Sequence, residues 1–318
     1  MEQISIQFNL IVLIRICFLQ PISLSLLKKE IIVQMKMAGW GSGFLGILIF
    51  SGSLPATRVA VTGFSPLFLT SARAVIAALL AAALLVSLRQ KRPARRDLVS
   101  LATVALGVVL GFPLLTALAL QHVTSAHSIV FIGLLPLATA IFGVLRGGDR
   151  PKPAFWLLSS LGSLLVAGYA LTQSSGASLS GDMLMIAAIL VCGLGYAEGA
   201  VLSRRLGGWQ VISWALLLAL PFMLILAAMT LPTTWSGVSI PAWIGLGYVS
   251  VFSMLIGFIF WYRGLAIGGI AGVSQLQLLQ PFFGLMLAGL VLNEPVAWSM
   301  IIVSALVVCC VAGAKRFV

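Results

Sequence analysis

Charged residues are scarce in this sequence. Only 8% of its 318 residues are Asp, Glu, Lys or Arg, and 61% are hydrophobic. Soluble globular domains carry about 25% charged residues, and these cover much of the surface that faces water. A chain of this length with so few charges cannot cover such a surface. The composition therefore excludes a soluble domain and predicts that lipid is the solvent for most of the chain.

Acidic residues, histidine and cysteine are scarcer still. The sequence holds seven Asp and Glu, two His and four Cys. The cysteines lie in apolar stretches without metal-ligand spacing, which is typical of small buried hydrophobic residues. A membrane enzyme needs nucleophiles, carboxylates or metal ligands gathered at one place. The scattered acids argue against an enzyme, and we expect neither a metal site nor a cofactor.

Nucleotide-binding motifs are missing. The sequence has no Walker A loop, so ATP is not expected to drive the protein directly. GSGFLG at residues 41–46 satisfies the G-x-G-x-x-G pattern, but that pattern binds dinucleotides only after a strand in a soluble βαβ unit. We expect these glycines to permit close contact between helices instead, as small residues do in membranes.

Long apolar runs fill the rest of the chain. A membrane-crossing helix needs about 20 mostly apolar residues, and ten runs qualify. The sequence thus predicts an all-α integral membrane protein with ten transmembrane helices. They lie near residues 39–60, 66–88, 98–118, 124–145, 154–172, 183–203, 209–231, 241–262, 270–291 and 296–314.

Lysine and arginine are absent from every second loop. The loops at 61–65, 119–123, 173–182, 232–240 and 292–295 contain neither. The alternate segments carry them instead: Lys28, Lys29, Lys36, Arg89, Lys91, Arg92, Arg95, Arg96, Arg146, Arg150, Lys152, Arg204, Arg205, Arg263, Lys315 and Arg316. The positive-inside rule then places both ends of the ten-helix core in the cytoplasm of a bacterium, with the core in its inner membrane. The net charge of +12 reflects this topology and predicts no nucleic-acid partner.

Residues 1–37 differ from the core. They are apolar but include Arg15 and Pro21, and no basic region precedes the apolar stretch as it does in a signal peptide. This segment is interpreted as an N-terminal extension, either an extra or interfacial helix or an upstream start before Met35 or Met37.

The two halves of the core carry matching residues. Pro136 pairs with Pro281 and Asp149 with Glu294, each 145 residues apart, and a Gly-Phe pair recurs at 111–112 and 257–258. We therefore expect two repeats of five helices, residues 38–172 and 173–318. Because five is odd, the second repeat has inverted topology, as in many secondary transporters. Pro136 and Pro281 are candidate helix-break positions, since proline cannot donate to the helix ladder.

The repeats resemble a known family. GSGFLGILIFSGSLPATRVAV and FSPLFLTSARAVIAALL are similar to the first two helices of the EamA repeat of the drug/metabolite transporter superfamily. GDRPKPAFWLLSSLGSLLVAGYALT and NEPVAWSMIIVSALVVCCVAG resemble its fifth-helix pattern in the two halves. The resemblance covers residues 38–314 and implies a metabolite transporter of unspecified substrate. Asp149 stands where the family usually has glutamate, and Ser304 stands near a usual glycine.

Arg73 is a candidate substrate-site residue. It lies seven residues into the second predicted helix, about 10 Å below one membrane surface. A charge at that depth is expensive and needs a reason. Arg73 either meets an anionic or zwitterionic substrate in a water-filled cavity or bonds backbone carbonyls structurally.

Glu198 lies within the apolar run GLGYAEGAVLSRR at residues 193–205. Helical spacing gives it no basic partner on its own helix. An apolar site penalises the charged carboxylate, so Glu198 is a candidate to carry protons along a central cavity. The alternative is a bridged or protonated structural carboxyl. Trp261 and Tyr262 are expected at the membrane interface, where aromatic belts form.

Ser274, Gln277 and Gln280 recur every three residues, ending beside Pro281. This spacing predicts one polar stripe that lines the cavity, or else hydrogen bonds between helices.

These features favour a secondary transporter that exports a small polar metabolite, such as an amino acid, by alternating access. Its expected partners are the substrate, protons as a candidate coupling ion, and membrane lipid. The alternative is a transporter of another solute class, such as a drug, an organic anion or a sugar derivative, that works by exchange. A channel would need a symmetric charged or carbonyl filter, which the sequence does not suggest.

Overall fold

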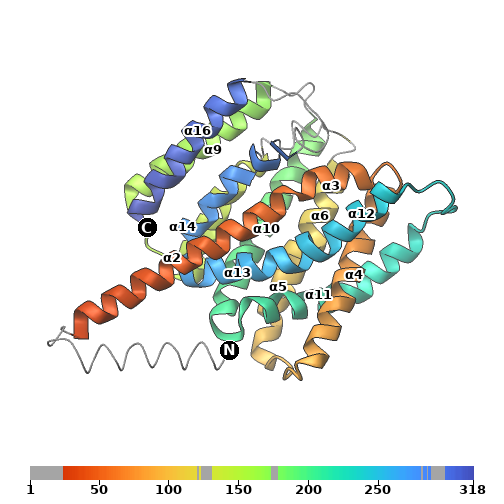
Figure 1. The fold of residues 1–318 in the computed structure, drawn as a ribbon, viewed down its shortest axis with the longest axis horizontal. Helices are drawn as coiled ribbons and strands as arrows, with labels where there is room; N and C mark the ends of the chain where they lie inside the picture. Colours follow the sequence, from red (N-terminus) through yellow and green to blue (C-terminus); the bar gives the residue numbers. More distant parts are fainter. Residues whose placement is uncertain are drawn as a thin grey trace.

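The computed structural model describes residues 24–119, 122, 131–172, 178–280, 282–284, 286–287 and 298–318. Within these ranges all regular structure is helical, and no strand occurs. The all-α prediction is therefore confirmed for the described part. Figure 1 shows the helices packed side by side in one bundle.

The helices follow in chain order. Their bounds are α2 Leu24–Ser51, α3 Ser53–Ala60, α4 Pro66–Ser87, η1 Arg95–Asp97, α5 Leu98–Val104, η2 Ala105–Gly111, α6 Phe112–Ala119, α8 Leu135–Gly147, α9 Pro153–Thr172, α10 Leu179–Leu206, α11 Gly208–Met229, α12 Ile240–Tyr248, η3 Val249–Ile256, α13 Gly257–Gly268, α14 Ile270–Ser274, η4 Gln275–Leu279, α16 Trp298–Ala314 and η5 Lys315–Phe317.

Six helical stretches of the described chain are long and apolar enough to cross a membrane. They are Val33–Thr57, Pro66–Ser87, Arg95–Ala119, Leu179–Leu206, Gly208–Met229 and Ile240–Gly268. Two shorter apolar helices follow the same pattern, Leu135–Gly147 and Pro153–Tyr169. The expected spans at 124–145, 270–291 and 296–314 run partly over residues outside the description, so a count of ten stays a prediction. Helix α2 begins at Leu24, well before the expected start near residue 39.

Local sequence signals explain several helix ends. The Ser65 hydroxyl accepts a hydrogen bond from the Phe68 amide, and Pro66 occupies the first turn of α4, where no amide hydrogen is needed. Helix α8 ends at Gly148, whose φ of 72° suits glycine. Pro136 lies in the first turn of α8, directly after a turn at 133–134. The chain thus leaves helical geometry next to this proline.

Both halves contain a π-helical segment at the same place. Segments η2 and η3 lie one repeat apart, and each ends at the Gly-Phe pair that the sequence repeats. A Cβ at Gly111 would overlap the Leu106 carbonyl oxygen, and one at Gly257 would lie 3.0 Å from the Phe252 carbonyl oxygen. The wider π turn brings the carbonyl five residues earlier against the glycine. The recurring glycines therefore have a common backbone reason.

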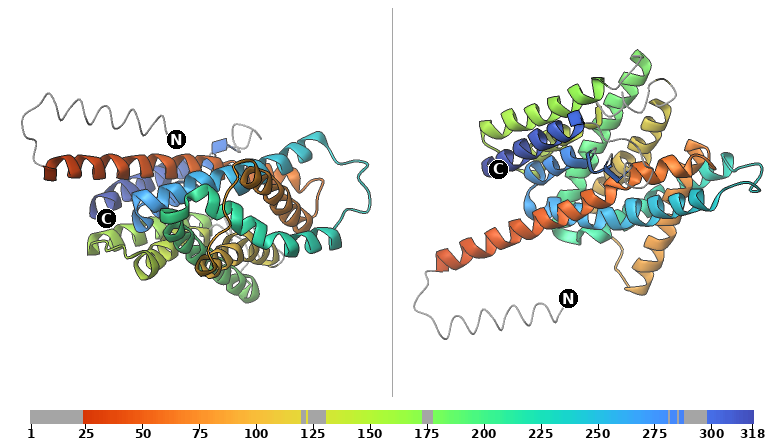
Figure 2. Two further views of the ribbon diagram at one scale, coloured as in Figure 1. Left: turned by 90° about the horizontal axis from the view of Figure 1, so that it is seen from below. Right: turned by 45° about the horizontal axis from the view of Figure 1, so that its top comes forward.

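Glycines also bring helices together. Helices α2 and α13 run side by side (Figures 1 and 2), and Gly43 and Gly46 of α2 lie against Val273 and Trp261. Gly107 of η2 faces Gly195 of α10 in the same manner. The interpretation of GSGFLG as a packing motif is thus confirmed for Gly43 and Gly46.

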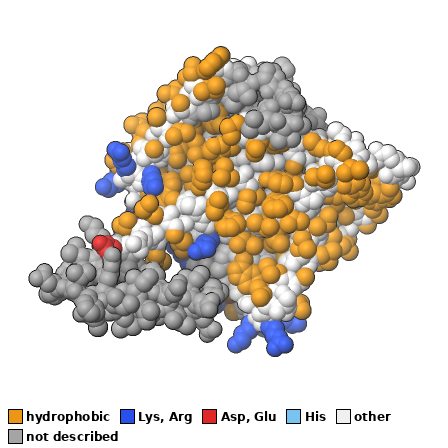
Figure 3. All heavy atoms as spheres, in the orientation of Figure 1, with side chains coloured by type: hydrophobic (Ala, Val, Ile, Leu, Met, Phe, Trp, Pro, Cys, Tyr) orange, Lys and Arg blue, Asp and Glu red, His pale blue; other side chains and the backbone are white. Residues whose placement is uncertain are grey.

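The outer surface suits lipid. In Figure 3 hydrophobic side chains cover the visible face, while Lys and Arg gather toward its left and lower edges. Large exposed hydrophobic residues occur on many helices, among them Leu79, Leu157, Phe222, Ile244 and Ile302. Helices α9 and α16 pack against each other (Figure 1) and present such residues outward. A largely apolar exterior with few charges is what a membrane-embedded bundle requires.

Candidate functional site

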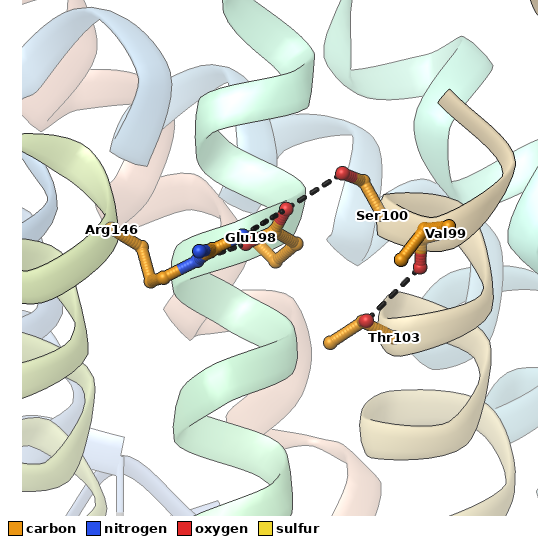
Figure 4. A network of polar contacts seen from close by, with 5 residues as sticks. All are labelled: Val99, Ser100, Thr103, Arg146 and Glu198. Atoms are coloured by element: carbon orange, nitrogen blue, oxygen red, sulfur yellow. Dashed lines mark hydrogen bonds and ion pairs between the residues drawn. The ribbon is translucent and has the colours of Figure 1, made fainter. Parts of the chain in front are cut away.

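Glu198 lies in α10 and is bonded from two other helices (Figure 4). Arg146, in the last turn of α8, donates from Nε to Oε2 at 2.9 Å and from Nη2 to Oε1 at 3.2 Å. The Ser100 hydroxyl of α5 donates to Oε1 at 2.6 Å. Sequence spacing along α10 gave no basic partner, because the partner comes from a distant helix. The Glu198 side chain is 7% exposed and Arg146 is 56% exposed, so the pair lies at the edge of the bundle.

Asp97 forms a second buried ion pair. Its side chain is 3% exposed in η1, and Arg205 of α10 donates from Nη2 to its Oδ1 at 2.6 Å. Arg96 Nε lies 3.9 Å from the same oxygen. A buried carboxylate with an arginine at this distance is compensated, whereas an isolated one would be costly.

Asp149 forms a third pair in the loop after α8. Arg204 Nη2 lies 3.6 Å from its Oδ1, and the Ala271 amide donates to its Oδ2 at 2.7 Å. Arg204 also donates to the Gly147 carbonyl at 3.0 Å and the Ala266 carbonyl at 3.3 Å. Asp149 therefore satisfies an orphan amide at the start of α14 as well as an arginine.

We call these residues, Asp97, Ser100, Arg146, Asp149, Glu198, Arg204 and Arg205, the ion-pair layer. Each of its three acids pairs with an arginine of the other predicted repeat: Asp97 with Arg205, Asp149 with Arg204 and Glu198 with Arg146. The layer thus fastens the two halves to each other at the arginine-rich end of the bundle.

A different polar group surrounds Tyr196. Tyr196 is one half-turn before Glu198 on α10, so the two side chains leave the helix on nearly opposite sides. Arg73 of α4 lies close enough to Tyr196 for an electrostatic interaction, and its Nε is buried without a hydrogen-bond partner among the described residues. Gln277 of η4 lies close enough to Tyr196 for a polar interaction between the two side chains.

Aromatic rings enclose Tyr196. Its ring centroid is 5.6 Å from that of Trp261 and 6.0 Å from that of Phe258, both on α13. Trp261 and Tyr262 are 0% exposed, so the expectation that they line the membrane interface is wrong. Gly199 of α10 leaves space for the Tyr262 ring, and Gly46 of α2 lets the backbone of α13 approach closely at Trp261. The indole Nε1 of Trp261 is buried and has no partner in the described part of the chain.

The polar stripe after α14 is largely buried. Ser274 is 0% exposed and donates to the carbonyls of Ala271 at 2.9 Å and Pro136 at 3.3 Å. Gln277 is 5% exposed, and Gln280, at the end of η4, is partly exposed. Because η4 is a 3₁₀ helix with three residues per turn, these three positions share one face.

We call Arg73, Tyr196, Trp261 and Gln277 the central polar cluster. Tyr196 is eight residues from Arg204, about 12 Å along α10, and Arg73 is about 10 Å from the opposite start of α4. With a hydrocarbon core of about 30 Å, these distances place the cluster near mid-depth.

Three predicted site residues fall into these two groups, whereas Ser274, Gln280 and Pro136 join neither. Arg73 and Gln277 both lie within polar interaction range of Tyr196, and Glu198 belongs to the ion-pair layer and does not pair with Arg73. Pro281 lies outside the described residues. Sequence reasoning missed Arg146, Asp97, Tyr196 and Trp261 as members of a site. The only signal for Tyr196 was its place in the run that contains Glu198.

Metal-ligand groups and the cavity between α8 and α10 give no second candidate site among the described residues. Among the described residues no group of three or more His, Cys, Asp or Glu side chains could hold a metal ion. A cavity of about 240 Å³ between α8 and α10 has only apolar walls, including Phe131, Ile141 and Ile189. A polar ligand would find no hydrogen-bonding partner there.

Comparison with known proteins identifies the family. The EamA-like transporter family model matches twice, at residues 37–171 and 179–314. "Uncharacterized transporter YdeK" of Bacillus subtilis (strain 168) is 67% identical over 279 residues, 88% of this chain and 97% of that protein. "Uncharacterized inner membrane transporter YedA" of Escherichia coli (strain K12) is 24% identical over 226 residues, 68% of this chain and 71% of that protein.

The fold has a counterpart among solved structures. One, titled "Crystal structure of protein", superposes with a TM-score of 0.74 over 88% of this chain and 99% of that chain, at 18% identity. This likeness concerns the fold alone. The two family matches and the similarity to the Bacillus protein go further: this chain belongs to the EamA-like transporter family of the drug/metabolite transporter superfamily.

Proposed function

We propose that this protein is a secondary transporter that exports a small polar metabolite, such as an amino acid, across the cytoplasmic membrane of a bacterium. The observation that carries the proposal is Arg73. Its guanidinium lies near mid-depth, with a buried Nε that has no partner in the described part of the chain. A buried charge left incompletely paired is costly, and a carried carboxylate would compensate it. On this proposal the protein is not an enzyme.

The ion-pair layer would serve as the cytoplasmic gate. Loop charges predict that the arginine-rich end faces the cytoplasm. Alternating access requires that the two repeats separate at one end while they close at the other. The three ion pairs between the repeats would then break whenever the site opens inward. Two inverted repeats of similar sequence supply two states of similar energy.

Glu198 would couple this gate to protons. Arg146 from α8 and Ser100 from α5 bond its carboxylate, and Tyr262 from α13 packs beside the neighbouring Gly199. Protonation of Glu198 would remove the charge that holds Arg146 and would favour separation of the repeats. Exchange of one solute for another is the second candidate, since Arg146 and Ser100 already bond both oxygens of the Glu198 carboxylate.

Transport by purified protein in lipid vesicles tests this function. Efflux and uptake of amino acids, organic anions, sugar derivatives and hydrophobic cations are compared with and without a pH gradient. Arg73→Ala and Arg73→Lys, at matched protein levels, are expected to lose transport of carboxylate-bearing solutes. Normal transport by both variants would mean that Arg73 is structural.

Labelling from intact cells tests the orientation. Single cysteines at Gln90 and at Ser236 are placed in a cysteine-free background. An impermeant reagent is expected to label the cysteine at Ser236, in the loop between α11 and α12, and not that at Gln90. The reverse pattern would contradict the assignment of the gate to the cytoplasmic end.

A further inference from the structure

Two buried polar atoms besides Arg73 Nε lack a partner in the central polar cluster. They are Trp261 Nε1 and Gln277 Oε1, neither of which has a hydrogen-bond partner among the described residues. Trp261 is 0% exposed and Gln277 is 5% exposed. Folded proteins leave few buried polar atoms without a hydrogen bond. Several of them on segments that meet around one tyrosine indicate a place where another molecule binds.

The chemistry of these atoms is of two kinds. Arg73 and Trp261 offer N–H groups that can only donate, whereas the amide oxygen of Gln277 can only accept. The Gln275 oxygen is also buried without a partner among the described residues, but its amide nitrogen donates to the Ala271 carbonyl at 3.4 Å, on another face of the helix than Gln277. Ser274 does not join the group, since its hydroxyl already bonds two carbonyls.

Tyr196 lies next to both the donor residues and the acceptor residue. Its ring lies edge-on to that of Trp261 with centroids 5.6 Å apart, and its side chain lies within polar interaction range of Gln277 and Arg73. Residues of α4, α13 and η4 that carry unpartnered donors or an acceptor therefore surround one residue of α10. A purely anionic ligand would satisfy the donors and leave the Gln277 amide oxygen without a partner.

We propose that Trp261 and Gln277 determine substrate specificity by binding the carboxylate and the ammonium group of a zwitterion, respectively. The carboxylate accepts from Arg73 and from Trp261 Nε1, and the ammonium group donates to Gln277 Oε1. The carried molecule is thus an α-amino acid with both groups free, and neither its amine nor its hydroxy-acid analogue fits as well. This inference rests on the proposed function and deepens it.

Competition in vesicles tests the assignment. The standard L-amino acids are first ranked as competitors of transport by the full-length protein. For the best competitor, its decarboxylated amine and its 2-hydroxy acid are then measured in the same assay. We expect the amino acid to compete at least tenfold better than either analogue, since a site built to bond a polar group rejects analogues that lack it.

Two substitutions test the contact to the carboxylate and the contact to the ammonium group separately. Trp261→Phe keeps a ring but removes the N–H, and should weaken the amino acid and the hydroxy acid about tenfold while the amine is unchanged. Gln277→Leu removes the acceptor, and should weaken the amino acid and the amine so that the preference over the hydroxy acid disappears. Trp298→Phe, at an exposed tryptophan of α16, is the matched control and should change none of the three.

The outcomes are distinct. If Trp261→Phe and Gln277→Leu both keep the wild-type preferences, the two residues are structural and the inference is wrong, while the transport function stands. If solutes other than amino acids are carried and no amino acid competes, the proposed substrate class itself fails. Should Gln277→Leu not fold, Gln277→Glu replaces it. It should raise the amine relative to the hydroxy acid, and an unchanged ratio would overturn the proposal.

Discussion

The ion-pair layer and the central polar cluster lie within two turns of each other on α10, yet they treat polar atoms differently. In the layer, Asp97, Asp149 and Glu198 each meet an arginine from the other repeat. In the cluster, the Nε of Arg73, the Nε1 of Trp261 and the Oε1 of Gln277 have no partner among the described residues.

The two regions show two ways in which a membrane protein can contain polar groups that are costly to bury. Polar groups in an apolar interior are tolerated when they pair with one another or face a solute or water. The charges of the ion-pair layer pair with one another, so the layer can hold the two repeats together. The polar groups of the central polar cluster can face a solute, so the cluster can bind a solute and release it. If this is right, substitutions in the two regions should affect stability and transport in different proportions.

We expect the largest effect at Arg73, where a substitution should reduce transport without reducing stability. Arg73→Met removes a buried guanidinium with an unpartnered Nε, so thermal stability in detergent should stay the same or rise. Transport of a carboxylate-bearing solute should fall by about a hundredfold, because a charge-assisted hydrogen bond contributes roughly 1.5–3 kcal/mol. The control is Arg263→Met, at an exposed arginine of α13, with little effect on either. A marked loss of stability in Arg73→Met would place Arg73 with the paired residues instead.

At Arg205 we expect the reverse, so that a substitution should reduce stability more than transport. Arg205→Ala leaves the buried Asp97 carboxylate with only Arg96, whose Nε is 3.9 Å away. Breaking a fully buried pair costs about 3–5 kcal/mol. Because Arg205 is 49% exposed and Arg96 remains, we expect about 1–2 kcal/mol here. Adding Asp97→Asn should recover most of this loss. A thermal-unfolding double-mutant cycle measures the coupling, and additive effects would contradict the pairing.

The two regions were not equally visible in the sequence. Arg73 and Glu198 stand out because each is charged within an apolar run. Their surroundings could not be predicted in the same way. Arg146 bonds Glu198 across 52 positions of the chain, whereas helical spacing reports only on neighbours three or four residues away. The helix type and two family repeats follow from local patterns, but pairing between helices depends on tertiary packing.

The aromatic residues show the same limit. Trp261 and Tyr262 follow an apolar run and precede Arg263, which is the pattern of an interface belt. The structure continues α13 to Gly268, so these residues fall inside the helix and turn toward α2 and α10. Gly-Phe at 111–112 and 257–258 was visible as a repeat, whereas the π segments that it ends were not.

A subtler effect is expected at Glu198, where the layer would act on transport. Glu198→Gln keeps the size and a hydrogen-bond acceptor for Ser100 but cannot ionise. We expect it to fold, to retain exchange of substrate without a gradient, and to lose accumulation driven by a pH gradient. Asp149→Asn is the control, because Asp149 also pairs with an arginine but caps α14. Full pH-driven accumulation by Glu198→Gln would make Glu198 a bridging residue only, with coupling elsewhere or by solute exchange.

The smallest expected effect concerns the π segment that joins the two regions. Segment η2 follows the short helix α5, which carries Ser100 of the layer, and Gly107 packs it against α10 beside Tyr196. A methyl group at Gly111 would overlap the Leu106 carbonyl oxygen and approach the Val191 side chain. Overpacking of this kind costs about 1–3 kcal/mol. Alanine is favoured over glycine in helices by up to about 1 kcal/mol, which offsets part of that cost.

Gly111→Ala should therefore destabilise the protein by about 1 kcal/mol in thermal unfolding. Gly257→Ala should have the same sign, because its added methyl would lie 2.6 Å from Cε1 of Phe50 and 3.0 Å from the Phe252 carbonyl oxygen. Gly247→Ala is the matched control in the same span as Gly257, since no atom lies within 4 Å of its added methyl, and it should be neutral or stabilising. If Gly111→Ala and Gly257→Ala behave like Gly247→Ala, the π turns do not require glycine. The backbone between the ion-pair layer and the central cluster would then tolerate ordinary α-helical geometry in both repeats.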